Sequence, residues 1–177
     1  ETDASADDIR AAQLRLAGIY LDHHAADQAA PYIAEVLKRN TEDVDASFLK
    51  GRMHLMKAQG DAALTAFSAV VRQRPDFIKG YLYLAQAHRH NKNDLAAAAV
   101  LQKGLQVSPN EKSLHLALAK VQLARKDYKA VEQEYLRALA IDPSDHLLQA
   151  QLGDFFLALK EYKRAEREYA EIINKSP

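Results

Sequence analysis

The sequence predicts an all-α fold in which antiparallel helix pairs stack into a solenoid. Residues that favour helices, namely Ala, Leu, Gln, Glu, Lys and Arg, fill long stretches of the 177-residue chain. Apolar residues recur at spacings of three and four, as in Leu14, Ala17 and Leu21, which is the period of a helix with one buried face. Four of the five prolines stand 34 residues apart: Pro75, Pro109, Pro143 and Pro177. Helix breaks at such a strict interval indicate a repeated unit.

Alignment of the sequence with itself at a shift of 34 residues gives five units in register. A column of small residues in the first half of each unit consists of Ala17, Gly51, Ala85, Ala119 and Gly153. A column of large residues in the second half consists of Ile33, Phe67, Leu101, Tyr135 and Tyr169. We therefore expect two helices of about a dozen residues per unit, with the large side chain packed over the small residue. Since one pair cannot bury its apolar face alone, neighbouring pairs must stack.

The expected organisation is an N-terminal extension, residues 1–9, followed by a single domain, residues 10–177. The units within it are residues 10–43, 44–77, 78–111, 112–145 and 146–177. Proline ends the second helix of a unit because it lacks an N–H and disfavours helical geometry in the preceding residue. In "AIDPSDHLL", Pro143 ends the fourth unit's second helix, and Ser144 or Asp145 caps the first helix of the fifth.

The columns resemble those of the tetratricopeptide repeat (TPR) family, whose unit is a pair of helices. The fifth unit matches with Leu152, Gly153, Phe156, Tyr162, Ala165, Tyr169 and Pro177. The fourth unit matches with Leu118, Ala119, Tyr128, Tyr135, Ala138 and Pro143. The tryptophan that the family often places early in the first helix is missing, and its column holds Gln13, Ser47, Tyr81, His115 and Gln149. The resemblance implies a right-handed superhelix whose first helices line a concave groove for partner peptides.

Two units depart from the regular pattern. In the first, Pro31 lies near the start of the second helix, where it removes little hydrogen bonding if Asp27 is the N-cap. In the second, Lys50 stands where leucine is usual, and the turn at Gln59–Asp61 comes late. We therefore expect the first helix of the second unit to be longer than the others and its second helix to be shorter.

Composition excludes several classes of function. Lys plus Arg and Asp plus Glu each number 24, a balance that argues against a dedicated nucleic-acid binder and against electrostatic membrane attachment. The absence of cysteine excludes disulfides and zinc sites built on thiolates. The acidic start "ETDASADD" is not a signal peptide, and without an initiator methionine we expect a processed form or a fragment. The compartment stays open between the cytoplasm and the periplasm or envelope of a bacterium.

The sequence contains no recognisable catalytic motif, so we expect no enzyme activity, no cofactor and no metal. His54 and His88 share one column of the repeat. They could form a pH-sensitive or metal-binding pair, but half-buried histidines with hydrogen-bond partners are the favoured interpretation.

The candidate partner-binding residues are those that the family resemblance places on the groove face of the first helices. They comprise an apolar set, a cationic set, one amide and one acid: Leu14, Phe48, Leu82 and Leu116; Arg52, Lys79, Arg89 and Lys120; Gln86; and Asp154. A further column holds Leu21, Leu55, Arg89, Leu123 and Leu157. An apolar stripe beside cations predicts a protein or peptide partner with apolar anchors and acidic character. Alternatively, the leucines only seal contacts between neighbouring first helices.

Two other functions remain open at this stage. The last repeat exposes apolar residues such as Tyr169, Ile172 and Ile173 if no helix covers it, so the chain could form a homo-oligomer and serve as an assembly platform in a bacterial envelope or secretion protein. It could also be the regulatory part of an enzyme or transporter whose active region lies outside this sequence. A chaperone-type carboxylate clamp is excluded because Leu14 and Gly18 occupy positions where the family places its clamp residues.

Overall fold

The computed structural model describes residues 5–175, and every regular element within that range is an α-helix. The helices there are α1 (Ala6–Asp22), α2 (Ala26–Arg39), α3 (Val44–Met56), α4 (Gly60–Gln73), α5 (Ile78–His90), α6 (Asp94–Val107), α7 (Lys112–Ala124), α8 (Tyr128–Ile141), α9 (His146–Ala158) and α10 (Tyr162–Lys175). The predicted all-α fold is therefore confirmed.

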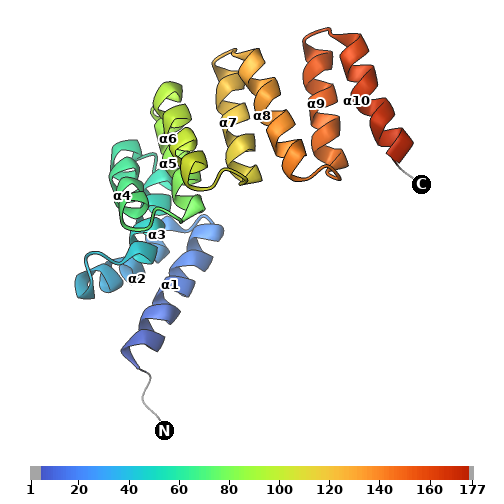
Figure 1. The fold of residues 1–177 in the computed structure, drawn as a ribbon. Coiled ribbons are helices and arrows are strands. Elements are labelled where there is room, and N and C mark those ends of the chain that lie inside the picture. The colour runs from blue at the N-terminus through green and yellow to red at the C-terminus, as the bar shows by residue number, and fades with distance from the viewer. Residues whose placement is uncertain (1–4, 176–177) are drawn as a thin grey trace. The chain divides into compact units, whose positions relative to one another are not determined.

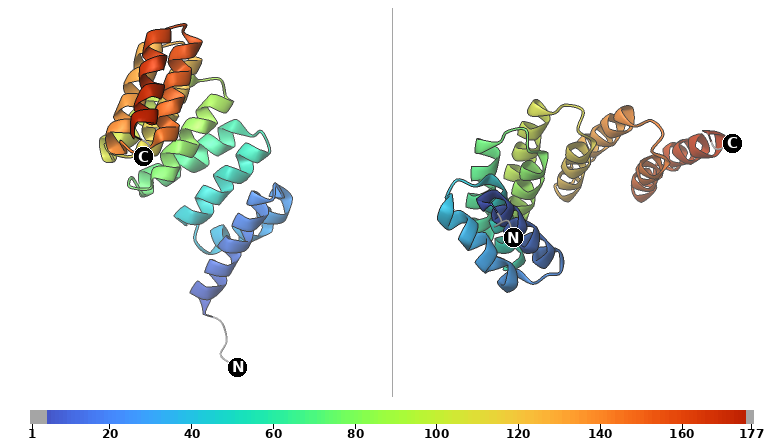
Figure 2. Two further views of the ribbon diagram at one scale, coloured as in Figure 1. Left: turned by 90° about the vertical axis from the view of Figure 1, so that its right-hand side faces the viewer. Right: turned by 90° about the horizontal axis from the view of Figure 1, so that it is seen from below.

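Contacts between helices divide the chain into two compact units, the first ending at Val107 and the second beginning at Ser108. In unit 1, α1 packs on α2, α3 on α4 and α5 on α6, and these pairs follow one another from blue to green in Figures 1 and 2. In unit 2, α7 packs on α8 and α9 on α10, coloured yellow to red. Each unit thus consists of stacked helix pairs, while a single domain of residues 10–177 stays a prediction.

The small and large columns of the repeat pack against each other inside the pairs, as the sequence predicts. A Cβ atom on Gly51 would lie 2.6 Å from Cε1 of Phe67, and one on Gly153 would lie 2.8 Å from Cε1 of Tyr169. Both distances are too short for a real contact. The missing side chain on the first helix therefore lets the aromatic ring of the second lie directly against it.

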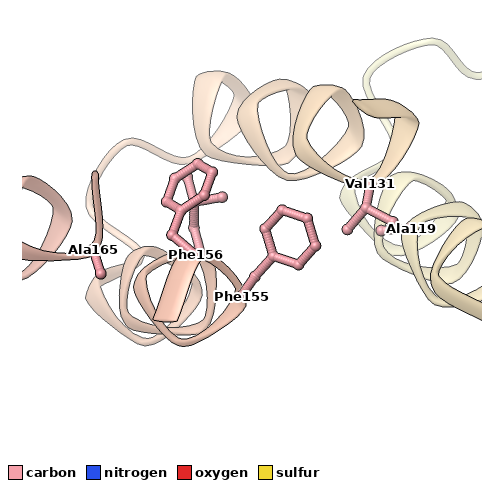
Figure 3. Packing of buried hydrophobic residues seen from close by; sticks show 6 residues of the cluster. Ala119, Val131, Phe155, Phe156 and Ala165 are labelled. Carbon is pink, nitrogen blue, oxygen red and sulfur yellow. The ribbon is translucent and has the colours of Figure 1, made fainter. Parts of the chain in front are cut away.

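The core of unit 2 centres on two adjacent phenylalanines of α9. Phe155 points toward Val131 of α8 (Figure 3), and its ring centroid lies 6.1 Å from that of Tyr135. Phe156 is covered from α10, where the Arg164 guanidinium lies 3.9 Å from the centre of its ring. One helix thus supplies large side chains to both the preceding and the following helix.

The turn inside every pair has the same unusual geometry. The second of its three residues has a positive φ between 57° and 62°, and these residues are His24, Ala58, Lys92, Lys126 and Lys160. In the α7–α8 turn, the Lys126 N–H donates to the Leu123 carbonyl and the Asp127 N–H donates to the Gln122 carbonyl, both at 3.0 Å. This pair of bonds is the Schellman motif, which usually places glycine at the left-handed position.

Replacing Lys126 by Gly should stabilise the protein, because a left-handed backbone strains every residue that carries a Cβ. We expect the free energy of unfolding to rise by about 0.5 to 1 kcal/mol, measured by urea denaturation. The matched control is Lys129→Gly, an exposed lysine within α8, which should lower stability by about 1 kcal/mol. A loss of stability in Lys126→Gly would contradict the proposed strain.

Two helix starts differ from those expected. α1 begins at Ala6, inside the expected extension, because Ser5 forms a capping box: its hydroxyl accepts from the Asp8 N–H at 3.1 Å while the Asp8 carboxylate accepts from the Ser5 N–H at 3.2 Å. The N-cap of α2 is Ala25 rather than Asp27. Pro31 therefore lies inside the helix, where it removes the hydrogen bond that an N–H would donate to the Asp27 carbonyl.

The helices of the second repeat have regular lengths, so the expected long first helix and short second helix were wrong. α3 has 13 residues and α4 has 14, as α5 and α6 do. The reason is that Ala58 takes the left-handed position, so Gly60 begins α4 instead of forming the turn.

At the start of α9, Asp145 is the N-cap, since its carboxylate accepts the Leu148 N–H at 2.9 Å.

Candidate partner-binding groove

The first helices of unit 1 share a hollow of about 370 Å³. Its lining comes from α1, α3 and α5 and from the turn after α1: Leu21, His24, Arg52, Leu55, Met56, Tyr83 and Gln86. Apolar side chains make up most of this wall, with one guanidinium, one amide and one imidazole among them. That mixture suits burial of an apolar anchor with a few polar contacts to orient it.

The charge of Arg52 is already balanced inside the hollow. Its Nη2 atom donates to Oδ1 of Asp22 at 2.6 Å, and the guanidinium lies 5.9 Å from the centre of the Tyr83 ring. The hydrogen bond from Arg52 holds the pKa of Asp22 below its usual value, so this carboxylate stays ionised. The predicted cationic stripe is therefore weaker here than a count of basic residues suggests.

The other predicted residues of unit 1 lie in different environments. Phe48 is buried, with ring centroids 5.1 Å from Phe77 and 5.0 Å from Tyr83, so it serves packing more than contact with a partner. Arg89 is paired with Asp94 at 3.3 Å. The remaining three do not line the hollow: Leu14 and Leu82 are half-buried, and Lys79 is exposed.

Three of the predicted residues belong to unit 2. Leu116 and Lys120 lie on α7, where the leucine is half-buried and the lysine exposed. Asp154 on α9 accepts a hydrogen bond from the Tyr169 hydroxyl at 2.7 Å. This bond raises the pKa of Tyr169 and ties the first helix of the last pair to the second.

The list of candidate residues missed several residues of the hollow. Leu21 and Leu55 were in the additional column considered above, but His24, Met56 and Tyr83 were not predicted. His24 occupies the left-handed turn, which carries no glycine to reveal it. Tyr83 precedes the predicted residue Gln86 by one helical turn on α5. This spacing places both on the same face of the helix, so it could have identified Tyr83 as a residue of the hollow.

His54 and His88, which share one column of the repeat, are both half-buried. The ring of His54 meets the Gln59 side-chain oxygen through Nδ1 at 2.7 Å. Burial lowers the pKa of His88, which favours its neutral form. Within residues 5–175, no group of three or more His, Cys, Asp or Glu side chains is placed to hold a metal ion. In the same range no helix is long and apolar enough to cross a bilayer.

Several solved structures have the same fold. The structure from Pseudomonas aeruginosa titled "Functional Characterization of Pseudomonas Aeruginosa pilF" aligns over 97% of this chain and 78% of its own, with a TM-score of 0.79 and 16% identity. MamA from Desulfovibrio magneticus RS-1, residues 41 to the end, aligns over 94% of both chains, with a TM-score of 0.74 and 16% identity. A thermophilic TPR protein from Thermus thermophilus aligns over 95% of this chain and 92% of its own, with a TM-score of 0.69 and 22% identity.

The sequence also matches the tetratricopeptide repeat model directly, over residues 14–76 and 57–112. Together these two stretches span more than half of the chain. Stacked helix pairs, the repeated small and large columns and this match agree, and the chain belongs to the tetratricopeptide repeat family.

Proposed function

We propose that this protein is a non-catalytic scaffold that holds a segment of a partner protein in the hollow of α1, α3 and α5. The observation that carries the proposal is the grouping of Leu21, Leu55 and Met56 beside Arg52 and Gln86 in one concavity. An apolar side chain of the partner would be buried against the first three. The exposed amide of Gln86 and the remaining guanidinium donors of Arg52 would then bind main-chain or acidic groups.

The acidic character of the partner follows from the donors in the hollow. Arg52 supplies five N–H groups and Asp22 occupies only part of them, so a partner carboxylate can bind beside Asp22 or displace it. The side chain of Arg52 is 19% exposed, which leaves the guanidinium within reach of a ligand. The apolar wall then supplies most of the affinity, and the donors fix the orientation.

Selection of a displayed random-peptide library against the protein tests this proposal. We expect selected peptides to share an apolar anchor flanked by acidic residues. The Gln86→Glu variant should weaken their binding about ten-fold, because it places a negative charge in the hollow. The control is Gln102→Glu, the same change at an exposed glutamine of α6, which should leave affinity unchanged. Peptides that bind the Gln86→Glu variant with the same affinity as the wild type would refute the proposed groove.

A second candidate function, self-association, is favoured by the outer face of α10. Here a hollow of about 410 Å³ lies over Tyr162, Tyr169 and Ile173, and Ile173 is 72% exposed. Within the two units, second helices pack on the first helix that follows them, as α2 does on α3, α4 on α5 and α8 on α9. On α1, Leu16 and Ile19 are exposed. The residues at the same two positions of the last two repeats are buried: Leu118 and Leu152, and Val121 and Phe155. We therefore propose that α1 of one copy packs on α10 of another, a head-to-tail contact.

Light scattering coupled to size-exclusion chromatography tests self-association with two variants. The wild type should form species that grow with concentration, while Ile173→Glu and Ile19→Glu should each be monomeric. A mixture of the two variants should form a species of two chains and no larger one, because each variant retains one intact end. A wild type that stays monomeric at high concentration would exclude this function without affecting the groove.

A further inference from the structure

A hollow of about 530 Å³ lies between α2 and α4, over one face of α3. Its apolar wall consists of Leu37, Ala62, Ala66 and Ala69. At 100° per residue, the α3 residues that line it, Ser47, Lys50 and His54, project from the side opposite to Arg52, Leu55 and Met56. The hollow is therefore a separate site from the partner-binding groove.

Two substitutions in the repeat pattern explain why this space is open. The column of Ser47 holds large, buried side chains in the later repeats: Tyr81, His115 and Gln149. The column of Lys50 holds buried leucines in the same repeats: Leu84, Leu118 and Leu152, at 5%, 2% and 0% exposure. In the second repeat a small side chain leaves the volume unfilled, and a lysine that extends to solvent replaces the leucine that would close it.

The polar groups of this hollow are arranged to receive an anion. In the described part of the chain, neither the Lys50 ammonium nor the Ser47 hydroxyl has a hydrogen-bond or ion-pair partner, and no carboxylate lines the hollow. By contrast, Lys57 at the end of the same helix is paired with Asp27 at 2.6 Å. An uncompensated cation at the rim of an apolar wall favours a ligand that is anionic at one end and apolar at the other.

We propose that this hollow binds a small aliphatic monocarboxylate. Its carboxylate accepts hydrogen bonds from the Lys50 ammonium and the Ser47 hydroxyl, and its hydrocarbon tail packs against Leu37 and Ala66. The Thr65 hydroxyl donates to the Asp61 carbonyl at 3.0 Å, so it contributes its methyl group and an acceptor. A volume of this size accommodates a tail of several carbon atoms, and burial of that tail separates such a ligand from inorganic anions.

Titration of the protein with hexanoate, followed by ¹H–¹⁵N NMR, tests the proposal. We expect saturable shifts at Ser47, Lys50 and Ala66 with a Kd of about 1 mM. Acetate, which has the charge without the tail, should bind at least about ten-fold more weakly, and hexylamine, which has the tail with the opposite charge, should not bind there. Stronger binding of inorganic phosphate than of hexanoate would overturn the proposal, as would the absence of saturation by hexanoate.

Variants at the hollow separate binding from folding. Lys50→Leu restores the column of the later repeats, so it should raise the thermal midpoint while abolishing the hexanoate shifts. Ser47→Tyr fills the space as Tyr81 does in the third repeat and should also abolish binding. Lys50→Arg should retain it, and Lys103→Leu, at an exposed lysine of α6, should leave it unchanged. Equal hexanoate affinity in Lys50→Leu and the wild type would refute the site. If Lys50→Leu fails to fold, Lys50→Gln gives the same comparison.

Discussion

Replacing Asp43 by Ala should lower the free energy of unfolding by about 2 to 3 kcal/mol. Asp43 caps α3 by accepting the Ala46 N–H at 2.9 Å, and it accepts two hydrogen bonds from Arg10, at 2.5 and 3.1 Å. Its side chain is only 2% exposed, so the variant loses the cap and leaves Arg10 without its buried partner. Asp45→Ala is the control: this carboxylate also contacts Arg10 but is 46% exposed, and its loss should cost less than about 1 kcal/mol.

The effect of Asp43 should also depend on pH in a defined direction. Burial alone would raise the pKa of Asp43, but the hydrogen bonds from Arg10 and from the Ala46 N–H outweigh it and hold the pKa below its usual value. A group whose pKa is lower in the folded state stabilises the fold above its unfolded pKa and loses that effect as the pH falls. Asp43→Asn retains the cap and removes the charge. Its stability difference from the wild type should therefore shrink below about pH 4, and a difference that grows there would contradict the assignment.

Replacing Glu134 by Ala should lower the free energy of unfolding by about 3 kcal/mol, the largest effect expected in unit 2. His115 and Glu134 are 6% and 5% exposed, and His115 Nδ1 lies 2.6 Å from Glu134 Oε2. The other ring nitrogen lies 2.9 Å from the Pro109 carbonyl. Both ring nitrogens of His115 thus face acceptors, and the variant would leave the buried Nδ1 without a hydrogen-bond partner. Urea unfolding followed by circular dichroism measures the loss.

Two further variants test whether burial is the cause. Glu132→Ala removes a carboxylate that pairs with Arg164 but is 29% exposed, and it should cost less than about 1 kcal/mol. The double variant His115→Tyr with Glu134→Val reproduces the residues of the third repeat, where Tyr81 is buried. Because removing both partners of a buried hydrogen bond leaves neither one unsatisfied, the stability of the double variant should lie within about 1 kcal/mol of the wild type. A double variant less stable than Glu134→Ala alone would disprove the account.

The sequence predicted the features of the fold that repeat. The contacts of Gly51 with Phe67 and of Gly153 with Tyr169 could be predicted from two columns of the repeat. A residue without a side chain on the first helix leaves room for the aromatic ring that follows on the second helix. Residue type and position narrowed the N-cap of α9 to Ser144 or Asp145, and the structure shows Asp145. Periodicity was sufficient for these because all copies obey the same packing rule.

The features that the sequence did not predict depend on side chains of single repeats. Left-handed turns at Ala58 and Lys126 carry residues that give no turn signal. The ion pair of Arg10 with Asp43 joins residues in different columns, and nothing in the pattern links them. In the groove, the pairing of Arg52 with Asp22 depends on where α1 ends, a boundary that periodicity does not fix.

The stacking of helix pairs also has a consequence for how the chain folds. Within each unit, contacts join helices that are at most two apart along the sequence, from α1 with α2 to α3 with α5. Structure can therefore form without closing long loops, which keeps the entropic barrier low. Each pair can serve as a nucleus on which the next is added, so residues such as Phe67 and Phe156 can begin to pack before the rest of the chain is ordered.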